Sequence, residues 1–329
     1  DSNPGFSHGN EYPAIAVPFP MNTWAPYTRP AKDSFYYQYP DPKIRGIRQT
    51  HQPSPWIGDY ATFSLMPVSG KLAVTEEDRA SEFRHETEVA RPSYYRVRLD
   101  TWKAIAEVTP TERCARFRFT FEDAADAYIV LDAFPGNSSV EIIPSEKKIV
   151  GITRFNHGGV PANFANYFVV VFDQPFAGHG TWTPEKTQSG ETRLEAKHAG
   201  AFVKFGSGPN QVVHCKVASS FISPEQALRN LEKEIGGADF DTIRMRAEKA
   251  WNEALGRVRV EGGLADQQRT FYSALYRSIV YPHRLHEYNE QGKPVYFSPY
   301  DGKVHDGVLY SDTGYWDTFR AAHPLYNLL

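Results

Sequence analysis

The sequence predicts a multidomain protein of β and α parts: an antiparallel β-sandwich, followed by helices that belong to a larger helical domain. Three observations predict this order. Strand-length apolar segments separated by Pro, Gly, Asn and Asp run up to about residue 222. From Ser223 onward, apolar residues recur at helical spacing instead. The 329 residues are enough for two domains of ~100–200 residues each.

Each expected strand is an alternating or continuous apolar stretch of strand length. No helical period of useful length interrupts the series, and the frequent turn residues favour antiparallel neighbours over parallel strands joined by helices. The expected strands cover residues 94–100, 115–121, 127–133, 139–155, 166–176, 191–206 and 211–221.

Three helices with recognisable ends are expected after the strands. The first begins with Ser223 as N-cap and Pro224 at the first helical position, and it closes at Gly236. Asp241 is the expected N-cap of the second helix. The third covers residues 264–282 and stops at its final proline.

The end of the chain carries apolar helix faces without visible partners. A polar, glycine-containing segment, residues 286–307, precedes a last helix that is predicted from near Tyr315. No helix-ending residue follows this helix. We therefore expect the chain to be a fragment, with its helix faces covered by a missing C-terminal part or another chain. One such face is the stripe Leu264, Phe271, Leu275 and Ile279.

Composition argues against several classes of function. The net charge of −3 gives no indication of nucleic acid or of an anionic membrane surface, and no apolar run approaches the ~20 residues of a membrane span. Aromatic residues make up 14% of the chain, which fits a large β-rich core and also a sugar-binding surface. The two cysteines, Cys114 and Cys215, lie in strand-like segments, and a disulfide between them stays open.

The first candidate site motif is a tight polar turn, residues 5–10, followed by an apolar strand punctuated by prolines. His8 is its candidate contact residue, because a neutral imidazole both donates and accepts a hydrogen bond. The alternative is a plain N-terminal turn that leads into an edge strand, where proline is tolerated.

The second motif is THQPSPWIGDY, residues 50–60. Pro53 and Pro55 hold their own φ angles and keep the preceding residues extended, so the backbone from His51 to Trp56 is stiff. Stiffness lowers the entropic cost of presenting Trp56 for stacking on a sugar and His51 for hydrogen bonding. The alternative is a turn whose tryptophan plugs the edge of the sandwich.

The third motif is SDTGYWDTFRAAHP. On a helix, Asp317 and Arg320 share a face, and Trp316 lies four residues before Arg320. Such a group could bind neighbouring sugar hydroxyls while the ring stacks on the sugar. The alternative is a capping and ion-pair cluster at a helix start, to which Asp312 and Thr313 would contribute.

Common catalytic signatures are absent from the sequence. It contains no G-x-S-x-G, no glycine-rich phosphate loop followed by lysine, and no H-E-x-x-H. The histidines are scattered, which gives little support to a transition-metal site. With 39 acidic residues, composition cannot select a catalytic carboxylate pair.

Together and in this order, the three motifs resemble the exo-acting α-mannosidases of glycoside hydrolase family 92. The matching segments spread over nearly the whole chain, and THQPSPW and WDTFR are the most specific of them. One departure is Ala14 and Pro20, where family members often carry glycine. The matching segments are HGNEYPAIAVPF, GIRQTHQPSPWIGDYATFSLMP, FRHETEVARPSYYRVRL, FYSALYRSIVYP and YWDTFRAAHPL.

The resemblance implies a domain layout and an activity. Residues 1–222 would be the N-terminal β-sandwich, residues 223–262 the helical linker, and residues 263–329 the truncated first part of an (α/α)6 catalytic barrel. The active site would lie where sandwich and barrel meet. The implied reaction is calcium-dependent hydrolysis of terminal α-linked mannose with inversion, expected for α-1,2 linkages of N-glycans outside the cytoplasm, in a secreted or periplasmic enzyme.

The resemblance also implies which residues bind the sugar. The general acid, the general base and most calcium ligands are expected beyond the end of this chain, so the chain alone is expected to be inactive. Its expected partners are a mannose-containing glycan and the remainder of the barrel. The alternative function is a non-catalytic carbohydrate-binding sandwich with helical appendages. The implied substrate-binding residues are Trp56, Asp317, Trp316, Arg320, His8 and His51, of which Asp317 is the principal one.

Overall fold

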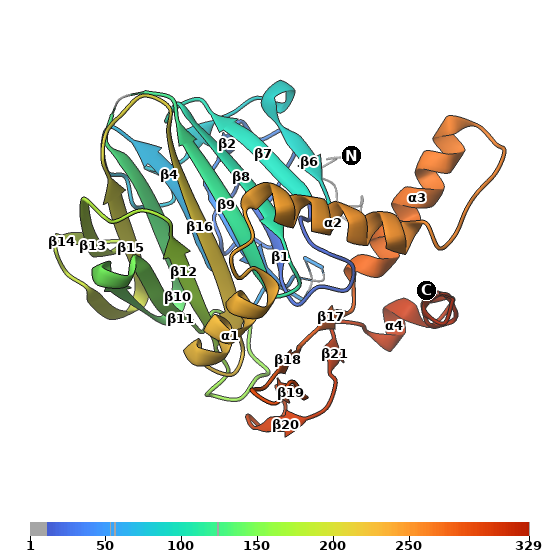
Figure 1. The fold of residues 1–329 in the computed structure, drawn as a ribbon. Helices are drawn as coiled ribbons and strands as arrows, with labels where there is room; N and C mark the ends of the chain where they lie inside the picture. The colour runs from blue at the N-terminus through green and yellow to red at the C-terminus, as the bar shows by residue number, and fades with distance from the viewer. Residues whose placement is uncertain (1–11, 53, 56, 124, 329) are drawn as a thin grey trace.

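The computed structural model describes residues 12–328 apart from 53, 56 and 124, and its main feature is one 14-stranded antiparallel sheet (Figure 1). Three strands, β13 (Gly178–Thr183), β14 (Lys186–Ser189) and β15 (Arg193–Phe205), join it through the pairing of β15 with β10. Along the main path the order is β1 (Thr23–Tyr27), β3 (Gly46–Thr50), β4 (Ser64–Ser69), β10 (Ala127–Ile143), β11 (Lys148–Thr153), β12 (Asn166–Phe172), β16 (Gln211–Ser220), β9 (Cys114–Phe121), β8 (Ala104–Pro110), β7 (Tyr94–Leu99) and β6 (Val89–Arg91).

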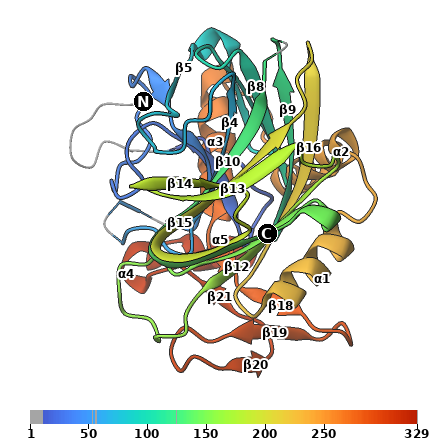
Figure 2. The same ribbon diagram turned by 90° about the vertical axis from the view of Figure 1, so that its left-hand side faces the viewer.

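The long strand β10 makes the sheet curl. Its first part pairs with β4 and its last part with β11, while β15 follows it on the other side. Between these parts the backbone turns through positive φ at Phe134, Gly136 and Asn137. The two halves of the sheet therefore face each other (Figures 1 and 2). Between them lies an aromatic core, in which Trp24 of β1 meets Phe117 of β9 with ring centroids 5.1 Å apart.

The sandwich prediction is thus confirmed in part, because the two layers belong to one curled, half-barrel sheet rather than to two sheets. Two predicted strands, 127–133 and the start of 139–155, are one strand, β10. The rest of 139–155 is a 3-10 turn, Pro144–Glu146, followed by β11. Strands β1, β3, β4 and β8 were not predicted. In β1 and β3 every residue is buried, polar ones included, so no apolar alternation marks them.

Two helices, α1 and α2, pack on the outer face of the sheet. Helix α1 (Pro224–Glu234) is capped by Ser223, as predicted, and Gly236 closes it with φ +51°. Helix α2 (Phe240–Leu255) begins earlier than predicted: its N-cap is Asp239, whose side chain accepts a hydrogen bond from the Thr242 N–H at 2.7 Å. The prediction of Asp241 as N-cap is wrong, because the buried ring of Phe240 already belongs to the first helical turn.

Helix α3 (Ala265–Val280) ends before Pro282, as predicted. Its apolar stripe is buried only at the C-terminal end, where Ile279 packs in a cluster with Trp251 of α2, whereas Leu264 is 72% exposed. Large exposed apolar side chains continue after α3. They include Tyr310, Tyr315, Trp316, Phe319 and Leu328, and Phe271 within α3 is exposed as well.

The segment after α3 contains strands that the sequence pattern did not show. Strands β18 (His286–Tyr288), β19 (Pro294–Phe297) and β20 (Val304–Asp306) form a small sheet set apart from the curled one (Figure 2). Strand β17 (His283–Arg284) pairs with β21 (Tyr310–Ser311), which brings both ends of this segment together. The strand β2 (Lys43–Ile44) pairs with β5 (Ser81–Glu82), and a 3-10 turn spans His85–Thr87.

The prediction of a single final helix is wrong. The structure has two short helices, α4 (Tyr315–Thr318) and α5 (Ala322–Tyr326), and neither contains a buried residue. Pro324 lacks the N–H that would continue a helix from α4, but it is tolerated in the first turn of a new one. None of the described helices is long and apolar enough to cross a membrane.

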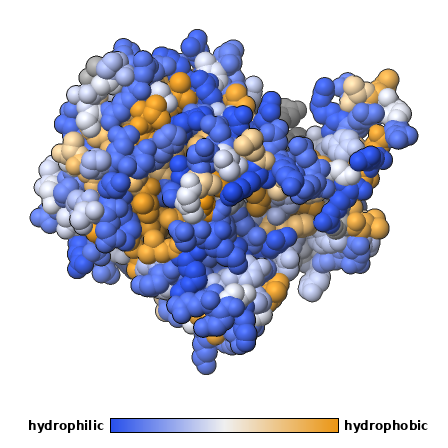
Figure 3. Space-filling view, in the orientation of Figure 1, coloured by the Kyte–Doolittle hydropathy of each residue, from blue (hydrophilic) through white to orange (hydrophobic). Residues whose placement is uncertain are grey.

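The two cysteines are free and buried on opposite sides of the sheet. Cys114 packs in the cluster beneath α1, whereas Cys215 belongs to the core between the two halves of the sheet. The outer face that carries α1 and α2 is mostly hydrophilic, with separate hydrophobic areas over the sheet (Figure 3).

Candidate functional site

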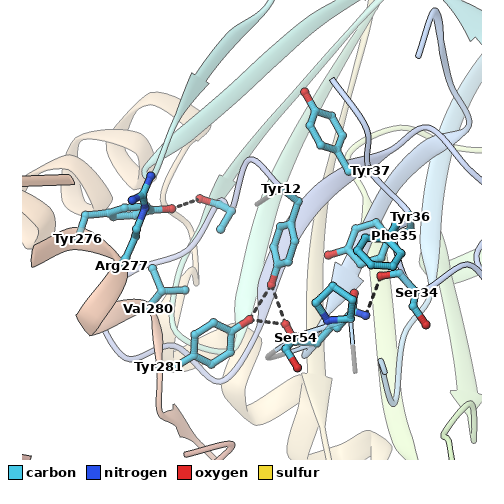
Figure 4. Close-up of a pocket in the computed structure, with 13 residues that line it drawn as sticks. Tyr12, Ser34, Phe35, Tyr36, Tyr37, Ser54, Tyr276, Arg277, Val280 and Tyr281 are labelled. Atoms are coloured by element: carbon cyan, nitrogen blue, oxygen red, sulfur yellow. Dashed lines mark hydrogen bonds between the residues drawn. The ribbon is translucent and has the colours of Figure 1, made fainter. Parts of the chain in front are cut away.

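A cavity of about 280 Å³ lies where the curled sheet meets the C-terminal end of α3 (Figure 4). Aromatic rings dominate its walls, and tyrosines come from both sides. Rings of this kind offer apolar faces and hydroxyl groups, the combination that a sugar requires. The described lining residues are Tyr12, Ala14, Ser34, Phe35, Tyr36, Tyr37, Gln52, Ser54 and Pro55 from the sheet side, and Tyr276, Arg277, Val280 and Tyr281 from the helix side.

Two tyrosine hydroxyls join the walls of the cavity. The hydroxyl oxygens of Tyr12 and Tyr281 lie 2.7 Å apart, and both hydroxyls lie within hydrogen-bond distance of the Gln52 carbonyl oxygen (Figure 4). The Gln52 side chain in turn donates to the carbonyl of Ser34 at 2.9 Å. Burial raises the pKa of Tyr12 to about 12, so its hydroxyl keeps its proton at neutral pH. The start of the second motif therefore lies at the rim of this cavity.

His51 is fully buried beside the cavity and is not among its lining residues. Its Nδ1 lies 2.8 Å from the Tyr60 carbonyl oxygen and its Nε2 lies 3.0 Å from Oδ1 of Asn22. Its ring also stacks on the Tyr60 ring. Burial, reinforced by the neighbouring His283, lowers the pKa of His51 to about 4. In this structure His51 is an enclosed group that supports the loop.

Asp59 closes the proline-rich loop, a role that sequence reasoning missed. Its Oδ1 accepts hydrogen bonds from the backbone N–H groups of His51 and Tyr60, both at 2.8 Å. Its Oδ2 accepts from the Thr50 hydroxyl at 2.8 Å and from the buried Arg48 guanidinium at 2.7 Å. One carboxylate therefore ties together both ends of the loop. The available signal was an aspartate four residues after the second proline of this motif.

Asp312 connects the second motif with the third. Its Oδ2 accepts a hydrogen bond from the Tyr60 hydroxyl at 2.5 Å and lies 2.6 Å from Nδ1 of His283. The alternative interpretation of Asp312 and Thr313 as capping residues is wrong, because the N-cap of α4 is Gly314, without a side-chain hydrogen bond. The sequence did not reveal the link between Tyr60 and Asp312, since 252 residues separate them.

The remaining predicted contact residues lie in and after α4 and are exposed. Trp316 is 89% exposed, and Asp317 is exposed as well. Helix α4 ends at Thr318, so Asp317 and Arg320 do not share a helix, and no ion pair joins them among the described side chains. The guanidinium of Arg320 lies 5.3 Å from the centre of the Phe319 ring instead. These side chains are not among the described residues that line the cavity.

Two of the predicted contact residues, His8 and Trp56, lie outside the described residues. The described part of the chain also contains no group of three or more His, Cys, Asp or Glu side chains that could hold a metal ion.

Two family models match the chain. Residues 4–220 match the glycosyl hydrolase family 92 N-terminal domain, and residues 226–329 match the glycosyl hydrolase family 92 catalytic domain. Among curated proteins, an uncharacterized secreted glycosidase of Arthroderma benhamiae is 29% identical over 272 residues. That alignment covers 73% of this chain and 35% of the fungal protein.

Solved structures show the same similarity. An inverting family 92 mannosidase from Bacteroides thetaiotaomicron matches 98% of this chain with a TM-score of 0.95 and 46% identity. A family 92 α-mannosidase from the same bacterium, solved with mannoimidazole, matches 97% of this chain with a TM-score of 0.86 and 25% identity. The chain covers 43% and 44% of those two proteins, so it spans less than half the length of these relatives.

Proposed function

This chain belongs to glycoside hydrolase family 92, and from that premise we propose that it is part of an α-mannosidase that removes terminal α-linked mannose from glycans with inversion. The observation that carries the proposal is the match of 98% of the chain, at 46% identity, to an inverting mannosidase. The tyrosine-lined cavity supports it, because aromatic faces and hydroxyl groups suit a sugar ring.

We propose that this chain contributes sugar binding rather than acid–base chemistry. An inverting glycosidase needs a general acid and a general base ~6.5–9.5 Å apart, with a water molecule between them. The described residues that line the cavity include no Asp or Glu. In this proposal the general acid, the general base and most of the calcium ligands come from the remainder of the barrel. Calcium prefers oxygen ligands, and when bound it would polarise the sugar hydroxyls.

The exposed apolar residues of α3 to α5 support the proposal that another segment or chain covers this face. Large exposed apolar side chains that recur along consecutive elements are typical of an interaction site. We propose that residues 263–329 begin the (α/α)6 barrel and that the rest of the barrel covers them. Trp316, Asp317 and Arg320 would then face the sugar together with Trp56 and His8, next to the cavity.

The proposed substrates are mannose-containing N-glycans with α-1,2 linkages, and the proposed location is secreted or periplasmic. The location is supported by the fungal relative, which is named as a secreted glycosidase.

Mannose release tests the proposal. The protein extended through the remaining barrel should release mannose from α-1,2-mannobiose, and proton NMR should show β-mannose as the first product, since inversion converts the α anomer. A chelator should abolish the activity, and the 329-residue chain alone should show none. Release of α-mannose first would contradict inversion, and no release from any α-mannoside would contradict the assignment. Glycan binding by a catalytically inert extended protein would favour the alternative of a carbohydrate-binding module.

Two matched surface variants test the role of α4. Trp316 and Tyr300 are 89% and 90% exposed, so Trp316→Ala and Tyr300→Ala should each change the free energy of unfolding by less than ~0.5 kcal/mol. In the extended enzyme, Trp316→Ala should lower kcat/KM at least about tenfold, the cost of ~1.4 kcal/mol of transition-state binding. Tyr300→Ala, in the turn between β19 and β20, should leave kcat/KM unchanged. Equal kinetics of the two variants would remove Trp316 from the site.

A further inference from the structure

The carboxylate of Asp312 joins three segments that are far apart in the sequence. The same oxygen, Oδ2, accepts a hydrogen bond from the Tyr60 hydroxyl and lies within bonding distance of Nδ1 of His283. Tyr60 belongs to the connection between β3 and β4, and His283 belongs to β17, just after α3. Asp312 itself follows β21 and precedes α4. The curled sheet, the end of α3 and the start of α4 therefore meet at one carboxylate.

Both partners of Asp312 are held in place by their own contacts. The Tyr60 ring stacks on His51 with centroids 4.8 Å apart, and the Tyr60 N–H is bound by Asp59. The His283 side chain is fully buried, with its ring edge-on to Tyr281 at 4.8 Å. Because neither partner can follow a displaced carboxylate, the two contacts restrain Asp312 to one position.

The backbone at Asp312 has the left-handed conformation, with φ at +68°. Residues other than glycine adopt it rarely, although Asp and Asn tolerate it better than most. Such a conformation persists where the surrounding contacts over-determine it. The pairing of His283 with Ser311 aligns the chain up to this point, and α4 begins three residues later. The turn at Asp312 therefore sets the direction in which α4 leaves the sheet.

Among the described residues, the other contacts of helix α4 are with α5: the Thr318 hydroxyl lies 3.1 Å from Nε2 of His323, and the Tyr315 and His323 ring centres lie 5.8 Å apart. Helix α4 has four residues and buries none of them, and Tyr315 and Trp316 are 83% and 89% exposed. The N–H of Asp317 binds the carbonyl of Gly314 within the same turn. By contrast, α5 is attached through Tyr326, whose hydroxyl donates to the carbonyl of Tyr281 at 3.3 Å.

We propose that Asp312 is a positioning residue that, through Tyr60 and His283, fixes α4 and its Trp316 and Asp317 relative to the tyrosine-lined cavity. The inference rests on the proposed function, because it assigns those two side chains to substrate binding. Asp312 is not among the described residues that line the cavity, so it acts through the residues it places.

Four variants of the extended enzyme distinguish the effect of the Asp312 carboxylate and its hydrogen bonds from the effect of the backbone turn at residue 312. Asp312→Gly keeps the left-handed backbone and removes the carboxylate, whereas Asp312→Asn keeps the shape and one acceptor oxygen. Tyr60→Phe removes only the hydroxyl donor. Asp306→Asn, at an exposed aspartate of β20, is the matched charge control.

Asp312→Gly should raise KM for an α-mannoside at least about tenfold with kcat within about twofold, since misplaced binding groups weaken substrate binding. Asp312→Asn should restore most of the affinity, and the double variant Tyr60→Phe/Asp312→Gly should be no worse than Asp312→Gly, because both remove the same bond. Asp306→Asn should match the wild type. A purely structural role would instead lower the active fraction, which reduces kcat and leaves KM unchanged, and that result would overturn the proposal.

Amide hydrogen exchange gives a readout that does not need activity. Exchange of residues 313–320 should accelerate in Asp312→Gly and Tyr60→Phe, but not in Asp306→Asn, while the strands of the curled sheet stay protected. Unchanged exchange in both anchor variants would overturn the proposal whether or not the enzyme is active. Accelerated exchange with wild-type KM would overturn the link to substrate binding. If the wild type released no mannose, the proposed function would fail instead. Hydrogen exchange would then still test whether Asp312 holds α4 in place.

Discussion

Removal of the Asp59 carboxylate should destabilise the sheet more than any surface charge change. The pair of Arg48 and Asp59 is buried, with side chains 0% and 4% exposed, and the same carboxylate accepts from Thr50 and from two backbone N–H groups. In Asp59→Asn, the amide oxygen can keep the two backbone donors, but the amide nitrogen then faces the guanidinium. The variant therefore leaves Arg48 buried without its counter-ion, which typically costs ~3–5 kcal/mol.

The lower end of this range is expected for Asp59→Asn. Arg48 keeps weak contacts with Thr62 Oγ1 and the Ala31 carbonyl, both at 3.3 Å, and its guanidinium lies 4.3 Å from the centre of the Tyr36 ring. These contacts offset part of the lost charge, so we expect about 3 kcal/mol. Asp59→Ala also leaves two backbone N–H groups unsatisfied, at ~1–3 kcal/mol each, so its loss should exceed about 5 kcal/mol.

Urea unfolding followed by far-UV circular dichroism checks this ranking. The matched control is Asp123→Asn, which removes an ion pair with Lys103 whose side chains are 51% and 57% exposed. This control should lose less than ~1 kcal/mol. If Asp59→Asn unfolded within ~1 kcal/mol of the wild type, the buried loop-closing network described here would be refuted.

Two further predictions concern the sheet. Gly200→Ala would place a Cβ 2.0 Å from Cε2 of the buried Trp182, so it should lower the free energy of unfolding by at least ~1–3 kcal/mol. Gly206→Ala has open space around the new atom and should cost little. Melting temperatures compare the two variants, and equal values would contradict the packing around Trp182. Burial lowers the pKa of His198, but its hydrogen bond to Asp132 and the charge of Asp132 outweigh burial and raise it above 6.5. The stabilisation of the fold by the pair of protonated His198 and Asp132 is therefore complete below about pH 6.5 and is lost as pH rises through the folded pKa of His198. His198→Gln should accordingly lower the urea midpoint more at about pH 5.5 than at about pH 9. An equal loss at both pH values would disprove the link between His198 protonation and stability.

Sequence patterns predicted the helices and strands whose formation depends on residues that are close in the sequence. Continuous or alternating apolar residues predicted β7, β9, β12, β15 and β16, and capping residues predicted both ends of α1. Patterns failed where burial is decided by distant partners. Strand β3 carries Arg48, Gln49 and Thr50, which look like surface residues, yet all three are buried because Asp59, Thr62 and Ser219 satisfy their polar groups.

The candidate site shows the same difference between what sequence patterns reveal and what contacts between distant residues decide. The sequence by itself determined the family, because the THQPSPW and WDTFR motifs occur in order, and it identified the proline-rich loop and the α4 region as the segments of interest. It could not assign roles to Asp59 and Asp312. A carboxylate near an aromatic residue suits a sugar contact, a helix cap or a buried anchor equally well, and only its hydrogen-bond partners distinguish these roles.

Those partners come from the tertiary structure. Curling of the sheet brings the β3–β4 connection against the end of α3, so that Tyr60 meets Asp312 across 252 residues of sequence. A hydrogen bond acts over about 3 Å, whereas a sequence pattern reports only neighbours within a few turns of a helix or one strand. The family and the antiparallel, strand-rich character of the first part therefore follow from the sequence, whereas the single curled sheet and the anchoring of the site follow from the tertiary structure.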